Sequence, residues 1–241
     1  MGIYDRDYYR QPASPTRFGG ISLWSMNTKL IAINIAVFVV NSLFSQAVVD
    51  QDGFLLGHLH PIREWGLFSV DTAIKHFQIW RFLTFQFLHA NLQHIAYNMI
   101  ALFFFGPMIE SYFGSRKYLA FYLISGFAGA ITYMLLWAAR VYPSNAEMVG
   151  ASAGIFGVLI AAAQVAPDAQ VLIYGIIPMR LRVMAWGLLA IAAYTVLTNG
   201  NNAGGEAAHL GGAAAGFLLI KNPQILNFAN YRRGPRMRYR P

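Results

Sequence analysis

One serine and one histidine stand in sequence contexts that favour hydrolytic chemistry. Ser152 lies in Gly150-Ala-Ser-Ala-Gly154, and His209 lies in Ala208-His-Leu-Gly-Gly-Ala-Ala-Ala-Gly216. A serine hydroxyl is a weak nucleophile until a nearby base takes its proton, and a neutral imidazole is suited to that task near pH 7. The pair therefore predicts a serine hydrolase, provided that the fold brings the two side chains together.

Further polar residues lie just before and inside the start of a long apolar segment. His94 and Asn98 are four residues apart, so on a helix they share a face, and both carry side-chain donors. His89 and His94 are five positions apart, a poor spacing for two metal ligands on one helix, and no His-Glu-x-x-His motif occurs. The chain has no cysteine, which excludes thiol nucleophiles and cysteine-based metal sites. We expect neither a metal nor a cofactor.

Each motif also has an ordinary structural interpretation. Glycine- and alanine-rich segments pack helices closely in bilayers, so Ser152 could bond back to a carbonyl and His209 could simply join two helices. The Gly-x-Ser-x-Gly pattern also matches the nucleophile elbow of α/β-hydrolases, but that elbow needs a preceding strand and a soluble sheet. The nearest acids, Asp168 and Glu206, fall at expected helix ends, where solvated capping is the expected role.

The composition places these residues in a membrane. Apolar and aromatic residues make up 56% of the 241 residues, charged ones only 12%, and the mean hydropathy is +0.43, which predicts an integral membrane protein. Six segments approach the roughly 17 to 25 residues that span a hydrocarbon core. They cover residues 28–47, 92–109, 117–139, 150–166, 181–198 and 206–221. The predicted fold class is all-α, a polytopic bundle of six transmembrane helices.

The distribution of charge predicts the orientation of the bundle. With six spans both termini share a side, and 14 of the 18 Lys and Arg residues fall on that side. Because positively charged loops stay inside, both termini are predicted to be cytoplasmic. We divide the chain into a flexible cytoplasmic segment (1–27), a six-helix membrane domain (28–221) and a basic cytoplasmic tail (222–241). The tail is expected to contact anionic lipid and not nucleic acid.

This topology brings scattered motifs to one membrane depth. The second, fourth and sixth segments run from outside to inside, so His94, Ser152 and His209 all fall near their outer ends. Ionisable residues inside a bilayer are costly and mark functional sites unless they are paired. His209, Gly212 and Gly216 share one helical face, and such small residues would let the sixth segment approach its neighbour closely.

The motifs together resemble those of the rhomboid intramembrane serine proteases, over residues 28–221. The resemblance rests on Trp80-Arg81, on His89, His94 and Asn98, on Gly106-x-x-x-Glu110-x-x-x-Gly114, on Gly150-Ala-Ser152, and on Ala208-His209-x-x-Gly212-x-x-x-Gly216. One position departs from the family pattern, because Ala153 follows the serine where the family often has glycine. The resemblance implies a bacterial-type enzyme with a six-helix core in the inner (plasma) membrane, its active site opening to the outer side.

The resemblance also implies a role for each residue. Ser152 would be the nucleophile and His209 the general base, in a dyad that requires no carboxylate. His94, the Asn98 amide and the Ser152 backbone N–H would bind the oxyanion, and Phe156 would stack on His209. The remaining supporting residues would be His89, Gly150, Gly212, Gly216, Trp80, Arg81 and Glu110. The implied substrates are transmembrane helices of membrane proteins, cleaved near their outer ends through an acyl-enzyme.

Two other function classes stay open. A non-catalytic rhomboid-like protein would bind or escort membrane helices with the same fold, although such relatives usually lack the serine or the histidine. A transporter would use the polar core as a pathway. Neither class predicts a nucleophile, so labelling with a serine-directed reagent separates both from a protease.

Overall fold

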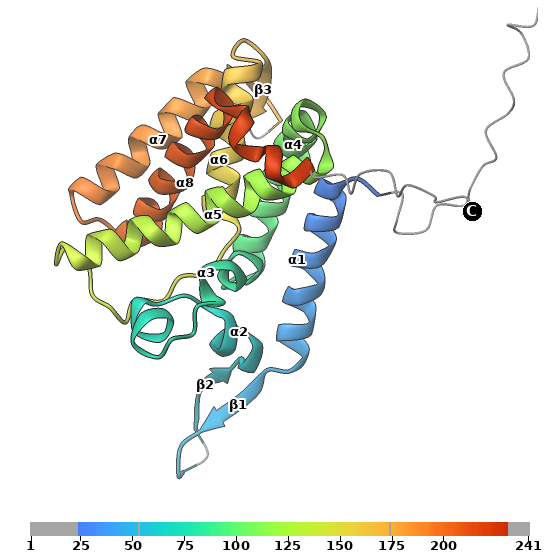
Figure 1. Ribbon diagram of the computed structural model, residues 1–241. Helices are drawn as coiled ribbons and strands as arrows, with labels where there is room; N and C mark the ends of the chain where they lie inside the picture. Colours follow the sequence, from blue (N-terminus) through green and yellow to red (C-terminus); the bar gives the residue numbers. More distant parts are fainter. Residues whose placement is uncertain (1–23, 53, 174, 231–241) are drawn as a thin grey trace, which may run out of the picture.

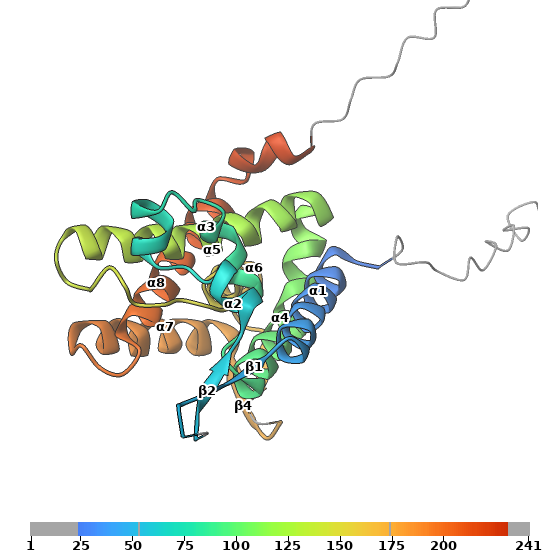
Figure 2. The ribbon, with the colours of Figure 1, turned by 90° about the horizontal axis from the view of Figure 1, so that it is seen from below.

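The computed structural model describes residues 24–52, 54–173 and 175–230 of the chain. Six long helices dominate this part, and each corresponds to one of the six apolar segments expected from the sequence. They are α1 (Met26–Leu43), α4 (Leu92–Phe113), α5 (Ser115–Ala138), α6 (Ser152–Val165), α7 (Leu181–Leu197) and α8 (Ala203–Lys221). Figures 1 and 2 show α1 and α7 on opposite sides of the bundle, with the other four helices between them. The protein is a polytopic helical bundle.

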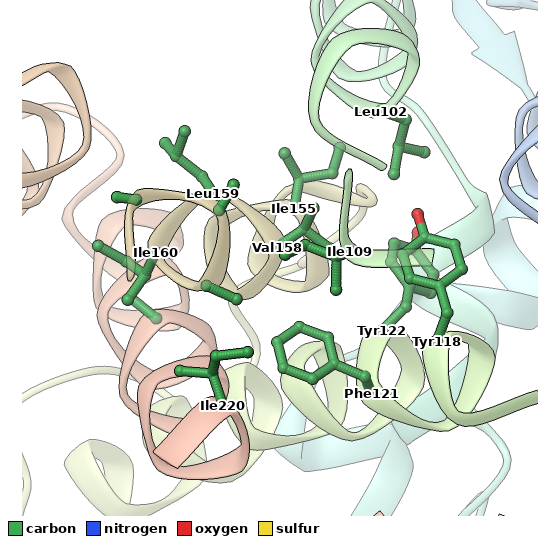
Figure 3. Close-up of a cluster of buried hydrophobic side chains, with 14 of the residues drawn as sticks. Leu102, Ile109, Tyr118, Phe121, Tyr122, Ile155, Val158, Leu159, Ile160 and Ile220 are labelled. Atoms are coloured by element: carbon green, nitrogen blue, oxygen red, sulfur yellow. The ribbon is translucent and has the colours of Figure 1, made fainter. Parts of the chain in front are cut away.

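The shortest of these helices, α6, lies at the centre of the bundle. Its sequence has no charged residue and no continuous polar face, so it can be surrounded by other helices. Ten of its 14 residues are buried. Figure 3 shows α6 between α4, α5 and α8, with Ile155 and Val158 in the same core cluster as Ile109 of α4 and Phe121 of α5. The central helix therefore holds Ser152 against three neighbours.

Helix α6 is too short to span a hydrocarbon core by itself. Three helices, α1, α4 and α5, are long and apolar enough to cross a membrane, whereas α6 and α7 are apolar but have only 14 and 17 residues. At about 1.5 Å per residue, α6 measures about 21 Å against a hydrocarbon core of about 30 Å. The predicted span at 150–166 was longer than this. Helix α6 is therefore about 9 Å shorter than that core.

The first helix begins earlier than predicted. Ser25 is its N-cap, and the Ser25 hydroxyl accepts a hydrogen bond from the Thr28 N–H at 3.0 Å. Asn27, assigned to the N-terminal segment, is instead buried in the bundle, where its Nδ2 donates to the Leu102 carbonyl at 2.9 Å. The helix thus includes the last two residues of the segment predicted at 1–27, and residues 1–23 lie outside the described residues.

Two short hairpins depart from the all-α prediction. Strand β1 (Gln46–Val49) pairs antiparallel with β2 (Leu55–Leu59), and β3 (Gln170–Ile173) pairs antiparallel with β4 (Ile177–Arg180). Both hairpins lie in connections between the long helices. The connection between α1 and α4 also holds the short helices α2 (Pro61–Gly66) and α3 (Arg81–Thr84) and the helical turns η4 (Asp71–Lys75) and η5 (Phe85–Phe87). The segment η6 (Pro223–Asn230) follows α8. The predicted tail therefore starts with a helical segment, and its residues 231–241 lie outside the described residues.

Glu110 joins α4 to the start of α1 at the end of the bundle away from Ser152. Its two carboxylate oxygens accept hydrogen bonds from the Met26 and Asn27 N–H groups at 2.7 and 2.8 Å. The Ser115 hydroxyl donates to the same carboxylate at 2.6 Å. The first N–H groups of a helix have no partner inside the helix and carry a partial positive charge, which suits a carboxylate. Glu110 therefore has an anchoring position in the fold.

Backbone contact between α6 and α8 depends on two glycines. A Cβ atom at Gly212 would lie 2.0 Å from the Ala153 carbonyl oxygen, and one at Gly216 would lie 2.4 Å from the Gly157 Cα. Neither distance leaves room for a side chain. The packing face predicted for Gly212 and Gly216 is therefore present, and its first contact lies beside Ser152.

Candidate active site

The start of α6 and the second turn of α8 bring the serine and the histidine together. Ser152 is the first residue of α6, and His209 lies in α8 one turn before Gly212. The distance from His209 Nε2 to Ser152 Oγ is 2.8 Å. The predicted contact between these two segments is present, and the Gly212 contact with Ala153 sets how close the helices come.

The His209 ring is held on two further sides. Phe156 stacks on it with a centroid distance of 4.3 Å and an interplanar angle of 8°, as expected for a residue one turn beyond Ser152. His209 Nδ1 lies 2.9 Å from Glu206 Oε2. Because an ionised carboxylate only accepts hydrogen bonds, Nδ1 carries the proton and Nε2 accepts the Ser152 hydroxyl. This tautomer is the one that a general base at Nε2 requires.

The contact made by Glu206 corrects the sequence prediction of a solvated capping residue. Glu206 precedes His209 by three residues, so the two side chains meet on one face of α8. Its side chain is only 24% exposed. The other acid, Asp168, is exposed at the far end of α6 and pairs with Arg182 at 3.1 Å, as suits a solvated residue.

Two polar side chains of α4 face the serine. The Ala90 N–H donates to His94 Nδ1 at 3.4 Å, which leaves the proton of a neutral imidazole on Nε2. That nitrogen lies 2.8 Å from the position of a Cβ atom at Gly150, and Ser152 Oγ lies 3.5 Å from the same point. Asn98 is 6% exposed, and its Nδ2 finds no acceptor among the described residues. A buried donor without an acceptor is available for a negatively charged ligand.

Gly150 is required by both its backbone and its surroundings. Its φ of +131° is rarely adopted by residues with a side chain, and a Cβ atom would meet the His94 ring at 2.8 Å. Ala153, which stands where the resemblance predicts glycine, is accommodated differently. Its methyl group packs against Gly129 of α5, where a second Cβ atom would lie only 2.7 Å away.

Ser152, His209, His94 and Asn98 line one cavity of about 510 Å³. The wall includes two charged residues that the sequence analysis did not select, Arg63 of α2 and Glu147, whose side chains form an ion pair of 3.4 Å. They come from the segments before α4 and before α6, and no motif connects them in the sequence. The lining comprises Arg63, Phe85, Ala90, Asn91, His94, Tyr97, Asn98, Glu147, Met148, Val149, Gly150, Ser152, Ala153, Asn202, Gly205, Ala208 and His209.

Trp80 and Arg81 lie outside this cavity, in the loop that pairs with the segment before Ser152. Arg81 is 5% exposed, and its Nη1 donates to the Leu67 carbonyl at 2.5 Å. The next residue, Phe68, exchanges two backbone hydrogen bonds of 3.0 and 2.7 Å with Met148. Trp80 stacks on Trp65 with ring centroids 5.2 Å apart. These contacts place Trp80 and Arg81 in the packing of the loop and not in the wall of the cavity.

The loop that Arg81 holds also reaches the serine segment through a second backbone contact. The Gly150 N–H donates to the Phe85 carbonyl at 2.9 Å. Together with the Phe68 and Met148 pair, this bond fixes the chain on the approach to Ser152. Loop and serine segment thus form one backbone-bonded unit.

His89 lies behind His94 and does not line the cavity. It is 3% exposed, and its ring meets the His94 ring edge to face with centroids 5.2 Å apart. Burial is the main cause that lowers the pKa of His89 to about 3, and the nearby His94 is a smaller one. Its imidazole is therefore neutral at physiological pH. His89 is therefore in a position to support the His94 ring without carrying charge.

Comparison with known proteins gives a consistent result over most of the chain. The rhomboid domain model matches residues 76–221. The rhomboid protease AarA of Providencia stuartii is 30% identical over 227 residues, which cover 86% of this chain and 76% of the relative. RHOMBOID-like protein 1 of Arabidopsis thaliana is 27% identical over 93% of this chain, and this chain matches 61% of its length. The rhomboid protease GluP of Bacillus subtilis is 32% identical over 61% of this chain, a match to 27% of GluP. From the extent of these matches, the chain belongs to the rhomboid family, which includes intramembrane serine proteases.

Proposed function

We propose that this protein is an intramembrane serine endopeptidase that cleaves transmembrane helices near their outer ends. The observation that carries the proposal is the 2.8 Å contact between Ser152 Oγ and His209 Nε2, at the start of a helix whose 14 residues are too few to span a bilayer. A hydroxyl paired with an imidazole of the correct tautomer is an activated nucleophile. Similarity to the rhomboid proteases AarA and GluP supports the same assignment.

The proposed reaction proceeds through an acyl-enzyme. Ser152 Oγ attacks the carbonyl carbon of the scissile peptide bond while its proton passes to His209 Nε2. The tetrahedral intermediate then collapses, the C–N bond breaks, and His209 gives the proton to the leaving amine. A water molecule, activated by the same imidazole, attacks the ester and releases the acid product and free Ser152.

Three donors are proposed to bind the oxyanion. The Ser152 N–H stands at the first position of α6 and has no acceptor within the helix. His94 Nε2–H and Asn98 Nδ2–H reach the same cavity from α4. The positive end of the α6 dipole adds favourable potential for the developing charge. Preorganised donors of this kind are each worth on the order of 10²-fold in rate.

An apolar groove supports entry of the substrate from the lipid. The groove has a volume of about 710 Å³, and Tyr97 lines both this groove and the cavity that contains Ser152. Its other walls come from α4, from the β3–β4 hairpin and from the start of α7. A helix in a bilayer hides its peptide bonds, so a segment with weak helix propensity is the expected target once it enters from this side.

The proposed location is a bacterial inner (plasma) membrane, with both termini in the cytoplasm and the cavity opening outward. Basic residues support this orientation. Arg116 and Lys117 begin α5, Arg180 and Arg182 flank the start of α7, and Lys221 ends α8. These helix ends lie opposite the end that carries Ser152, and positively charged loops remain on the cytoplasmic side.

Covalent labelling tests the proposal against a non-catalytic rhomboid-like protein that only binds membrane helices. Purified protein is treated with a fluorophosphonate, and the modified residue is located by mass spectrometry. We expect labelling at Ser152, none in Ser152→Ala, and strong reduction in His209→Ala, because an unassisted serine is a weak nucleophile. Equal labelling of wild type and a folded His209→Ala variant would refute the catalytic pair.

A cleavage assay tests the substrate class. A single transmembrane helix is reconstituted with the protein in lipid vesicles, and the cut is mapped by mass spectrometry. Cleavage near the outer end of the helix, lost in Ser152→Ala, is the expected result. Binding of the helix by the wild-type protein without any cleavage would favour the non-catalytic alternative.

A further inference from the structure

The second nitrogen of His209 has a carboxylate partner. Glu206 Oε2 lies 2.9 Å from His209 Nδ1, while His209 Nε2 lies 2.8 Å from Ser152 Oγ. The Glu206 carboxylate, the His209 imidazole and the Ser152 hydroxyl therefore form one continuous hydrogen-bonded chain. The His209 and Glu206 side chains are 14% and 24% exposed, so solvent screens this contact only in part.

The Glu206 carboxylate does not cap the start of α8. A carboxylate in the first turn of a helix commonly accepts backbone N–H groups or interacts with the helix dipole. The Glu206 N–H is already bonded to the Asn202 carbonyl at 3.0 Å. Among the described residues, the Glu206 carboxylate is hydrogen-bonded to His209 and to no backbone N–H. Its geometry is that of a partner for the imidazole.

We propose that Glu206 is a positioning residue that completes a Ser152–His209–Glu206 triad, an inference that rests on the proposed function. The carboxylate holds the proton on Nδ1, so that Nε2 accepts the hydroxyl proton of Ser152. Glu206 also stabilises the imidazolium that forms when Nε2 takes up that proton. Phe156 fixes the plane of the ring, and Glu206 fixes its rotation within that plane.

The other ionisable groups around His209 have different positions. His94 faces it from α4, and the Arg63–Glu147 ion pair lies in the wall of the same cavity. From α5, the Tyr133 ring reaches the first turn of α8, but its hydroxyl donates to the Pro143 carbonyl at 2.9 Å. Helix α6 has no charged residue. Glu206 is thus the carboxylate hydrogen-bonded to His209 in the described part of the chain.

The test is the pH dependence of kcat/KM for cleavage of a transmembrane substrate, measured for wild type, Glu206→Gln and Glu147→Gln. We expect Glu206→Gln to lower kcat by about 10- to 100-fold with little change in KM. The acidic limb of the kcat/KM profile should move to lower pH in this variant, because the site loses a negative charge. Glu147→Gln removes a carboxylate from the same cavity and should move the limb less.

A second variant keeps the test decisive where Glu206→Gln folds poorly. In Glu206→Ala, added formate should restore part of the rate, while chloride at the same ionic strength should not. Two results would overturn the triad. One is a Glu206→Gln variant whose acidic limb and kcat match those of wild type. The other is a rate loss that only follows a lower Tm and is not restored by formate. Absence of Ser152 labelling in wild type would instead refute the proposed protease function itself, so the two failures are distinguishable.

Discussion

Replacing Gly212 with valine tests whether backbone contact between α6 and α8 sets the geometry of the site. A Cβ atom at this position would lie 2.0 Å from the Ala153 carbonyl oxygen. Ordinary contact needs more than 3 Å, so the helices must separate by about 1 Å. Gly212 lies one turn from His209, and Ala153 follows Ser152. The separation therefore lengthens the 2.8 Å hydrogen bond between Ser152 Oγ and His209 Nε2.

A displacement of about 1 Å at reacting groups costs on the order of 10²-fold in rate, and overpacking costs about 1–3 kcal/mol in stability. We therefore expect Gly212→Val to insert and fold with a lowered Tm, and to cleave a reconstituted transmembrane substrate about 100-fold more slowly than wild type. Labelling of Ser152 by a fluorophosphonate should slow in parallel, because that reaction uses the same pair of side chains.

The matched control is Gly187→Val in α7, where an added Cβ atom meets nothing within 4 Å. Gly126 of α5 would be an unsuitable control, since a Cβ atom there would lie 1.9 Å from Gln86 Oε1. We expect Gly187→Val to retain the wild-type rate. A folded Gly212→Val variant that cleaves as fast as wild type would refute the reasoning, because the contact would then not control the distance between Ser152 and His209.

Three further predictions follow from other contacts. Asn98→Ala and His94→Ala should each lower kcat by roughly 10²-fold, about 3 kcal/mol, with Tm unchanged, and full turnover by a folded double variant would remove both from the mechanism. Arg81→Ala should lower the free energy of unfolding by about 1–3 kcal/mol, because the buried Leu67 carbonyl loses its donor, and should lower activity with it. Loss of activity at unchanged thermal stability would contradict that role. The His89 pKa of about 3 lies below the value of about 6.5 expected in the unfolded chain. Proton uptake then favours the unfolded state, so Tm in detergent should be highest above about pH 6.5 and fall toward pH 3, and His89→Leu should show a weaker dependence over this range.

The sequence was sufficient to predict the six helices and the meeting of Ser152 with His209. The length of each apolar segment predicts a membrane span, and the distribution of Lys and Arg predicts its direction. Because the fourth and sixth spans run in the same direction, Ser152 and His209 at their starts fall at the same end of the bundle. The face shared by His209 and Gly212 follows from helical periodicity. Those inferences succeed because each depends on local composition or on a fixed period and not on the path of a loop.

Features that depend on tertiary contact could not be predicted in the same way. The Glu206 contact was missed because an acid near a helix start is equally compatible with capping and with a partner one turn away. Its spacing of three residues before His209 was the available signal. The ion pair between Arg63 and Glu147 joins segments 84 residues apart, and no local pattern indicates such a pair.

The site is positioned mainly by backbone contacts. Phe68 pairs with Met148, the Gly150 N–H bonds to Phe85, and α8 meets α6 at Gly212. At the start of α4, the Asn91 side chain accepts the His94 N–H at 2.8 Å. Lipid offers helices no hydrophobic driving force for association, so close packing and hydrogen bonds must supply the precision that a catalytic site needs. Backbone atoms have less freedom than long side chains. Segments that are far apart in the chain can therefore present Ser152, His209, His94 and Asn98 to one cavity.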